Sequence, residues 1–299
     1  MPAEDAPEAA FRHHHALLIG ISQYQHKGVI EDRFGRISQA DGDARRLEAL
    51  LLRLGYGREK VRCLTNQEAT LEAIRAELRG LAEIPRAELV LVFWAGHGAR
   101  DENLNHLLPY GADPHDPHLL AKSSFTVNEI ADLASVFSSG NLALFFDTCF
   151  SAPNPGAYAW PAWSEVPKRL SDRVAIFAGA STYLALESPT RGGVLAQCLE
   201  QALADAPGTL HDEQGLVRVP ALAAYLDRQV AAEAKSWWIA HGQRGSCPQE
   251  PCIASRPHCQ TPLGRNLPFH IRARLAEATL PPAMRALAER VLESWPKPG

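Results

Sequence analysis

The stretch ELVLVFWAGHG, residues 88–98, decides the fold because a long apolar block runs directly into a histidine held between two glycines. The block lacks the alternation of polar and apolar residues that a half-exposed strand shows, so it predicts a strand buried on both faces of a parallel sheet. We expect this strand to end at residue 95. His97 then lies just beyond the carboxyl end of a buried strand, where open α/β sheets bind their ligands.

Four further runs rich in branched and aromatic residues have the same character, and they predict parallel strands at residues 16–21, 61–65, 142–147 and 174–179. Amphipathic helical patterns lie between them, and Gly55 ends the pattern of residues 43–55 as a C-terminal glycine does. Other helices are expected at residues 68–81, 126–138, 192–204 and 220–236. Strands that alternate with helices predict an α/β fold, with a doubly wound, mostly parallel central sheet flanked by helices.

The composition favours a folded protein with a protein or peptide partner. The chain has 299 residues, of which 46% are hydrophobic, enough for a large core. Its formal charge is −4 and its basic residues are scattered, so we expect no nucleic-acid partner. The acidic N-terminus lacks a signal-peptide pattern and the apolar runs are too short to span a bilayer, so we expect a cytoplasmic protein without a membrane partner.

One domain is expected over residues 14–270, after a flexible lead-in at 1–13 and before a helical extension at 271–299. The three histidines at residues 13–15 are interpreted as a solvated approach to the first strand. Two segments, 151–172 and 241–266, are long, rich in Pro and Gly and without periodicity. Long loops in compact domains often carry function, so both are candidate functional segments.

The six cysteines are expected to be reduced, because no secretion signal accompanies them. Three of them lie near two histidines and raise the question of a zinc site, which would use Cys247, Cys252, Cys259, His258 and His270. Their spacing contains no C-x-x-C pair. A structural or incidental role is therefore favoured, and no metal centre is expected there.

A cysteine stands in a position that corresponds to that of the histidine. Cys149 follows the strand at 142–147 by two residues, as His97 follows the strand at 88–95. Because the carboxyl ends of parallel strands meet at one edge of a sheet, we expect the two side chains to lie close together. A thiolate with a nearby imidazole that moves its proton is what nucleophilic thiol catalysis requires. The amides of Gly98 and Cys149 are candidate donors to the oxyanion of such a reaction.

Each of these residues also has an ordinary structural interpretation. A cysteine after a buried strand is often a small core residue, and a histidine between glycines is often part of a turn. Their corresponding positions on two strands of one sheet favour a site over two unrelated features.

These segments resemble the caspase-like cysteine peptidases of the peptidase C14 type, in particular the bacterial caspase homologues and the metacaspases. The phrases ALLIGISQY, DARRLEALLLRLGY, VRCLTNQEAT, LVFWAGHG, ALFFDTCFS and AIFAGAS follow one another in the family's order. Caspases carry the histidine about 50 residues before the cysteine, and Cys149 follows His97 at that separation. The resemblance covers residues 14–206, and more loosely the region to residue 270.

The resemblance implies a caspase-like peptidase domain in which His97 and Cys149 form a catalytic dyad that cleaves peptide bonds through an acyl-enzyme. Gly98 and Cys149 would form the oxyanion hole, and Ser181, in the phrase GASTYLALE, would line the substrate cleft. No third member of a triad is implied. Bacterial relatives often act in defence or programmed cell death and are activated by a partner protein.

The resemblance also bears on specificity, because the family includes enzymes that cut after aspartate and enzymes that cut after arginine or lysine. Asp43 matches the acid of the metacaspase N-D-A phrase, and Asp147 the acid of its D-x-C phrase. Two carboxylates in one S1 pocket bind a guanidinium and repel an aspartate, so we expect cleavage after Arg, with Lys weaker. Asp43 equally suits the first turn of a helix, and Asp147 equally suits a turn after its strand.

Other positions depart from the family pattern or bear on regulation. Phe150 stands where many relatives have histidine or arginine, and Ala95 where some metacaspases have serine. The family is often cut in the segment that corresponds to residues 151–172. The bonds after Arg169 and Arg173 are therefore candidate self-processing sites of a zymogen.

Calcium is the one cofactor considered, because it activates many metacaspases. Asp113 and Asp116, in the phrase DENLNHLLPYGADPHD, are its candidate oxygen ligands.

Three functional classes stay open. An arginine-directed cysteine endopeptidase is favoured. A caspase-fold interaction module that scaffolds without significant proteolysis is the alternative, but such a module has no need of the dyad and the two acids together. An aspartate-directed peptidase is disfavoured by the same two acids.

Overall fold

The computed structural model of the chain describes residues 11, 13–84, 89–100, 105–126, 129, 132, 141–151, 174–178, 185–188, 190–205, 210–213, 215–243, 247, 252–254, 262–265, 285, 286 and 289. At residues 100, 149–151, 174–178, 205, 252–254, 262, 264 and 265 the description covers the backbone alone. Every structural statement below concerns these residues.

A mixed sheet forms the centre of the protein, with strand order β11-β7-β6-β3-β1-β2. Its parallel strands are β1 (His14–Gly20), β2 (Val61–Thr65), β3 (Leu89–Arg100), β6 (Asn141–Ser151) and β7 (Val174–Ala178). Three antiparallel strands complete it: β11 (Cys252–Ala254) pairs with β7, and β4 (Asn105–Leu107) pairs with β3 and with β5 (Phe125–Thr126). All five parallel strands were predicted.

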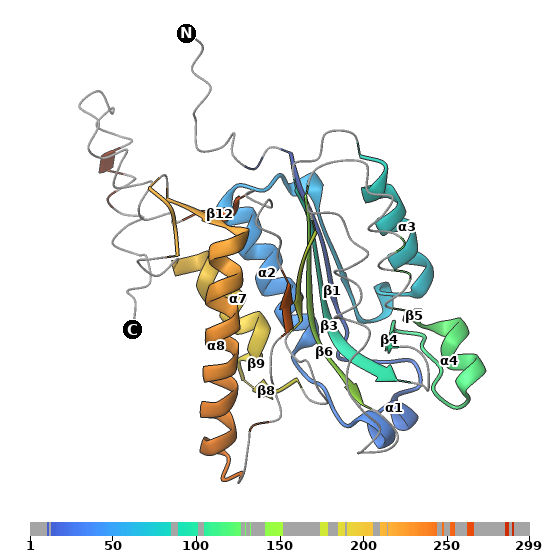
Figure 1. Cartoon of the computed structure of the whole chain (residues 1–299). Coiled ribbons are helices and arrows are strands. Elements are labelled where there is room, and N and C mark those ends of the chain that lie inside the picture. The colour runs from blue at the N-terminus through green and yellow to red at the C-terminus, as the bar shows by residue number, and fades with distance from the viewer. Residues whose placement is uncertain are drawn as a thin grey trace.

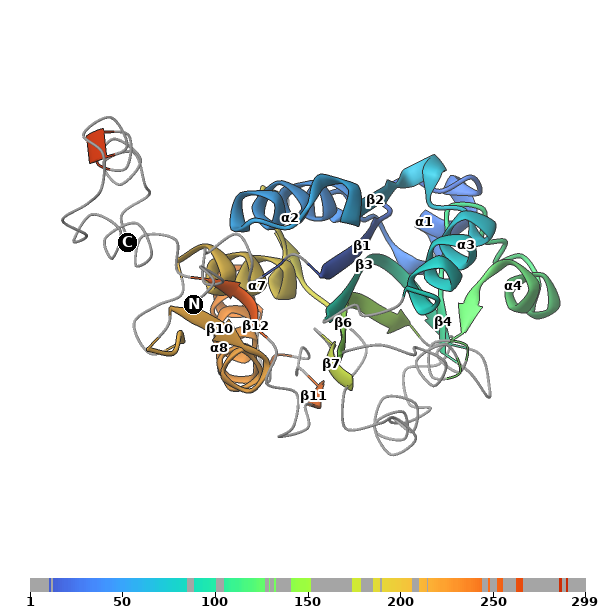
Figure 2. The same ribbon diagram turned by 90° about the horizontal axis from the view of Figure 1, so that it is seen from above.

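Helices cover both faces of this sheet, as Figures 1 and 2 show. One face carries α2 (Ala40–Leu54), α7 (Val194–Asp205) and α8 (Val219–Ala240). The other carries α1 (Lys27–Phe34), α3 (Leu71–Ala82) and α4 (Pro117–Ser123). The α/β fold with a doubly wound, mostly parallel sheet is thereby confirmed. Two small antiparallel pairs lie outside the sheet: β8 (Glu187–Ser188) with β9 (Gly192–Gly193), and β10 (Leu216–Arg218) with β12 (Pro262–Arg265).

Local sequence explains where α2 ends and where α3 begins. Gly55 adopts a left-handed conformation (φ 105°) after α2, and its amide donates to the carbonyl oxygens of Leu51 and Leu52. The hydroxyl of Thr70 caps α3 by accepting a hydrogen bond from the amide of Ala73. Each helix therefore has one terminus fixed by a local signal, and each presents one apolar stripe to the sheet.

The period of two in β3 divides the core into two layers. Leu91 and Phe93 are buried with α2, α7 and α8, whereas Val92 and Trp94 are buried with α3 and α4. A strand with large apolar residues on both faces cannot lie at a solvent surface, so β3 takes a central place in the sheet.

The two central strands are longer than the sequence indicated. The expected ends were residues 95 and 147, but β3 continues to Arg100 and β6 to Ser151. The apolar pattern stops earlier than the strands because backbone pairing does not depend on apolar side chains. Here β6 pairs with β3 as far as residue 99, and β4 pairs with the last residues of β3.

The histidines before the first strand also differ from expectation. His14 is fully buried in β1 and contacts the rings of Phe11 and Tyr56, with centroid distances of 5.1 and 5.5 Å. The interpretation of this histidine as solvated was wrong, because the first strand starts two residues earlier than predicted and takes His14 into the core.

Several expectations fall on residues outside the described part. The C-terminal extension at 271–299 is described only at residues 285, 286 and 289, and the helix expected at 126–138 only at residues 126, 129 and 132. Among the described helices, none combines the length and apolar character needed to cross a membrane.

A methyl group at Gly20 is expected to destabilise the protein. Gly20 lies at the carboxyl end of β1, where a Cβ would stand 2.3 Å from the carbonyl oxygen of Ala40 in α2. Gly20→Ala must therefore move α2 away from the sheet. We expect a loss of about 1–3 kcal/mol, the usual cost of overpacking, seen as a lower Tm in thermal unfolding.

Gly80→Ala is the matched control. Gly80 lies in α3 with nothing within 4 Å of its Cβ position, and a helix interior favours Ala over Gly. The Tm of the Gly80→Ala variant should stay the same as that of the wild type or rise. Equal losses in both variants would contradict the close approach of α2 to β1.

Candidate active site

The pairing of β3 with β6 brings the two candidate catalytic residues together. In this parallel ladder His97 is directly opposite Cys149. Neighbouring strands lie about 4.8 Å apart, so the two backbones are side by side at this point. Both residues lie within their strands and not after them, but the expected juxtaposition of the two positions is what the structure shows.

The imidazole of His97 lies in a buried aromatic setting. His97 is only 4% exposed, and the centroid of its ring is 5.4 Å from that of Tyr24 and 5.9 Å from that of Phe34. The backbone amide of His97 donates a 2.7 Å hydrogen bond to the hydroxyl of Tyr24. The Nδ1 atom of His97 is buried and has no hydrogen-bond partner among the described residues.

Burial sets the charge state of this histidine. Desolvation lowers the pKa of His97 to about 4, although a hydrogen bond with the backbone of Gly35 and the charge of Glu31 oppose the shift. The ring is therefore neutral at neutral pH. A neutral imidazole can accept a proton, which is what a general base for a thiol must do.

The glycines on either side of His97 have different surroundings. A Cβ at Gly96 (φ 156°) would lie 2.9 Å from the hydroxyl of Tyr24, so the absence of a side chain lets that hydroxyl reach the amide of His97. Gly98 lies where β4, β3 and β6 meet, opposite Leu107 on one side and Phe150 on the other. The role of its amide in an oxyanion hole stays a prediction.

Asp43 and Asp147 line the same cavity as His97. This cavity has a volume of about 510 Å³, and Trp237, Glu187 and Gly193 are also among its lining residues. Asp43 comes from the first turn of α2. Asp147 is opposite Ala95 in the β6–β3 ladder and shares a face with Phe145, because side chains two apart on a strand point the same way. That face carries α2, so the two acids converge.

The carboxyl groups of both acids are held by the chain around the start of α7. The amide of Gly193 donates to Oδ2 of Asp43, and the amide of Ala196 donates to Oδ2 of Asp147, each at 3.0 Å. A Cβ at Gly193 would lie 2.1 Å from Oδ2 of Asp147, so only glycine permits this approach. The two acids therefore have fixed positions before any substrate arrives.

Arg46 is a third charged partner of the pocket. Its guanidinium donates to Oδ1 of Asp43 and, at 2.9 Å, to the carbonyl oxygen of Arg191. Its Nε lies 3.1 Å from a carboxylate oxygen of Glu200. One guanidinium thus stands between two carboxyl groups, and no cation among the described residues contacts Asp147.

Burial raises the pKa of both acids. Desolvation and the nearby charge of Asp147 raise the pKa of Asp43 to about 8, against the opposing effects of the Gly193 amide and Arg46. Desolvation raises the pKa of Asp147 to about 7, against the amide of Ala196. Two buried carboxyls that disfavour each other's charge are a ready site for a cation.

Sequence reasoning missed several residues of this site. Tyr24, Phe34, Arg46 and Gly193 are far in sequence from the glycine–histidine–glycine and aspartate–threonine–cysteine phrases. Only the pair of glycines at 192–193, the first two residues of the helix predicted over 192–204, was a usable signal, because adjacent glycines often mark a close approach of backbone to another group.

The remaining predicted positions either are not described or do not line the cavity. Ser181 and the candidate processing residues Arg169 and Arg173 lie outside the described residues, as do Cys259, His258 and His270 of the considered zinc site. Asp116 caps α4, since its carboxylate accepts from the amides of His118 and Leu119. Asp113 pairs with the ring of His115 at 2.5 Å.

Comparison with known families agrees with this architecture. The family model of the peptidase C14 caspase domain matches residues 13–259. A search of curated proteins gave no match. Because the family match spans most of the chain, this protein belongs to the peptidase C14 caspase-domain family. The family has a protease-type fold, and its caspase-like proteases act on protein substrates.

Solved structures of the same fold come from an insect and a bacterium. Caspase-1 from Spodoptera frugiperda has a TM-score of 0.57 and 18% sequence identity, and the match covers 89% of this chain and 97% of that chain. Protein GSU0716 from Geobacter sulfurreducens has a TM-score of 0.54 and 13% identity, with 85% and 98% of the two chains covered. At these identities the likeness shows the fold.

The buried carboxyls make stability depend on pH in a defined direction. The pKa of Asp147 is about 7 in the folded protein and about 3.9 in an unfolded chain, so the folded state holds this proton more tightly. Its contribution to stability is full below the unfolded value and is lost as pH rises through 7. We therefore expect the Tm of Asp147→Asn to fall less than the wild-type Tm between about pH 5 and about pH 8.

Asp32→Asn serves as the control for this measurement, because Asp32 is an exposed residue of α1. Its Tm should follow the wild-type curve. An Asp147→Asn curve that also coincides with the wild-type curve would show that Asp147 titrates alike in the folded and unfolded chain.

Proposed function

We propose that the protein is a cysteine endopeptidase that uses a dyad of His97 and Cys149. The observation that carries this proposal is their direct opposition in the β3–β6 ladder, at the edge of the sheet where the 510 Å³ cavity lies. A buried neutral imidazole with a free Nδ1 among the described residues is suited to take the proton of a thiol.

The reaction then has two steps. The sulfur of Cys149 attacks the carbonyl carbon of the scissile bond while His97 takes the thiol proton and passes it to the leaving amine. The amides of Gly98 and Cys149 stabilise the oxyanion. Water then hydrolyses the acyl-enzyme, with His97 accepting a proton from water and returning it to the thiol.

The cavity supports cleavage after arginine. Asp43 and Asp147 are 2% and 6% exposed, and Arg46 pairs with Asp43 and Glu200 but not with Asp147, so three carboxyl groups share one guanidinium of the chain. A substrate guanidinium would bring the second positive charge and would stabilise the ionised form of Asp147. Charge-assisted hydrogen bonds of this kind are strong in a buried site, and the same acids repel an aspartate side chain.

The same features weigh against a purely structural module. Two buried carboxyls of raised pKa each lower stability, and so does a buried histidine whose Nδ1 has no hydrogen-bond partner in the described part of the chain. A scaffold gains nothing from them, whereas a peptidase uses all three. Regulation by self-processing after Arg169 or Arg173, by a partner protein, or by calcium is part of the proposal only through the family resemblance.

The dyad is tested with fluorogenic peptides that end in Arg, Lys or Asp at the cleaved bond. We expect the wild type to cleave after Arg fastest, after Lys more slowly, and after Asp not at all. Cys149→Ala and His97→Ala should each lose at least about 1000-fold of kcat, because the members of such a unit act together.

Cys63→Ser is the matched control, since Cys63 is a half-buried thiol of β2 outside the cavity. Activity that survives Cys149→Ala would refute the mechanism, and a preference for Asp would refute the pocket assignment. If no peptide is cleaved even after calcium is added and the chain is proteolytically nicked, the scaffold alternative holds.

The pocket predicts how cleavage depends on pH. Because ionised Asp147 binds a guanidinium and neutral Asp147 does not, kcat/KM for Arg peptides should rise as pH increases through about 7. Asp147→Asn should lower kcat/KM for Arg peptides at pH 8 by about tenfold or more and remove this rise. A rise that persists in Asp147→Asn would assign it to the thiol, and a normal rate in that variant would place the specificity elsewhere.

A further inference from the structure

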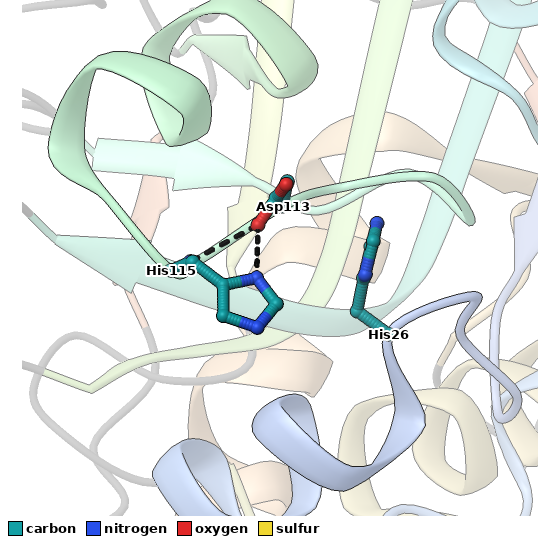
Figure 3. Close-up of side chains that lie close together, drawn as sticks. All are labelled: His26, Asp113 and His115. Atoms are coloured by element: carbon teal, nitrogen blue, oxygen red, sulfur yellow. Dashed lines mark hydrogen bonds and ion pairs between the residues drawn. The ribbon is translucent and has the colours of Figure 1, made fainter.

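A second cluster of chemically reactive side chains lies away from the cavity. Figure 3 shows His26, Asp113 and His115 close together, and one ligand atom from each lies within 4.8 Å of the others. His26 directly precedes α1, whereas Asp113 and His115 belong to the segment between β4 and α4. The two imidazole rings have centroids 5.5 Å apart and are nearly perpendicular, so the edge of one ring lies toward the face of the other.

Hydrogen bonds join the two chain segments that carry this cluster. The amide of Gln25 donates to the carbonyl oxygen of Tyr110 at 2.9 Å, and the guanidinium of Arg33 donates to the carbonyl oxygen of Pro114 at 2.5 Å. The amide of Asp113 also donates to the hydroxyl of Ser123 in α4. The three side chains are therefore brought together by a supported loop, which lowers the cost of ordering them around a ligand.

The donor set determines what the cluster can bind. Two imidazole nitrogens and one carboxylate oxygen are the ligands of Zn²⁺ sites that keep a fourth position for water. Ca²⁺ prefers a shell of six to eight oxygen atoms, and Asp116, the other acid considered for calcium, faces the N-terminus of α4. The donor set around Asp113 therefore favours a metal that accepts nitrogen ligands.

We propose that His26, Asp113 and His115 form a binding site for Zn²⁺ or a similar divalent transition metal. A tetrahedral site with bonds of about 2 Å places its ligand atoms about 3.3 Å apart, so small side-chain rotations close the present geometry. His115 is 52% exposed, and the exposed side of the cluster leaves room for a water as the fourth ligand.

Metal bound there would tie the start of α1 to the segment before α4. The opposite end of α1 carries Phe34, whose ring lies 5.9 Å from that of His97, and Gly35, whose backbone is hydrogen-bonded to the imidazole. The metal would therefore stabilise the helix that covers the candidate catalytic histidine. The site itself does not depend on the proposed peptidase activity.

The test is a Zn²⁺ titration of the full chain in competition with a chromophoric chelator. It is carried out in a Cys149→Ala background, so that the candidate nucleophile cannot bind the metal. His26→Ala and His115→Ala should each weaken Zn²⁺ binding by about tenfold or more, and Asp113→Asn, which keeps the shape of the side chain, should also weaken it. Zn²⁺ should raise the Tm of the parent protein and not that of His115→Ala.

His118→Ala is the matched control, because His118 is an exposed histidine three residues beyond His115 and outside the cluster. Its Zn²⁺ affinity should equal that of the parent. The absorption spectrum with Co²⁺ in place of Zn²⁺ should lack a thiolate-to-metal band. Unchanged affinity in both His26→Ala and His115→Ala, an equal loss in His118→Ala, or a thiolate band would overturn the proposal.

Should His26→Ala fail to fold, which far-UV circular dichroism would show, the exposed His115→Ala and the isosteric Asp113→Asn variants decide the question. Both must weaken binding for the proposal to stand.

Discussion

The candidate site depends on the register of β3 against β6. Every residue of β3 from Leu89 to Ala99 has a fixed partner on β6, and this register sets His97 opposite Cys149 and Ala95 opposite Asp147. A slip of one residue would turn each side chain to the other face and would take Asp147 away from α2. The large apolar residues on both faces of β3 and β6 exclude such a slip, because two cores would lose their packing at once. The hydrophobic core thus fixes the positions of the polar groups.

The acid pair shows a second constraint, which is that buried carboxyl groups need partners. Asp43 and Asp147 receive one backbone amide each from the start of α7, and Arg46 adds a guanidinium to Asp43. These contacts only partly offset desolvation, and so both carboxyls keep a raised pKa. Carboxyls with a raised pKa gain more from an added cation than carboxyls that are already fully ion-paired. Desolvation of the two carboxyls is thus the origin both of the lower stability of the free pocket and of its proposed preference for arginine.

Much of the fold could be predicted because buried parallel strands and amphipathic helices have strong patterns. The five parallel strands, α2 and α3 were found from such patterns, and the glycine at residue 55 was correctly placed at a helix end. The ends of β3 and β6 could not be found, because they are determined by backbone pairing with β4 and with each other. Nor could the burial of His14 be found, since a histidine before a strand is ordinarily solvated, and here the ring of Tyr56 from a distant position packs against it together with that of nearby Phe11.

For the candidate site, the sequence by itself determined which reactive residues to consider, because His97, Cys149, Asp43 and Asp147 all lie in short motifs that can be recognised separately. Only the tertiary structure decided which groups surround them. Tyr24 under Gly96, Arg46 between two carboxyls, and the cluster of His26 with Asp113 and His115 join segments that no local pattern connects. The physical reason is that apolar periodicity is written along the chain, whereas hydrogen bonds and charge contacts arise only when separate segments pack together.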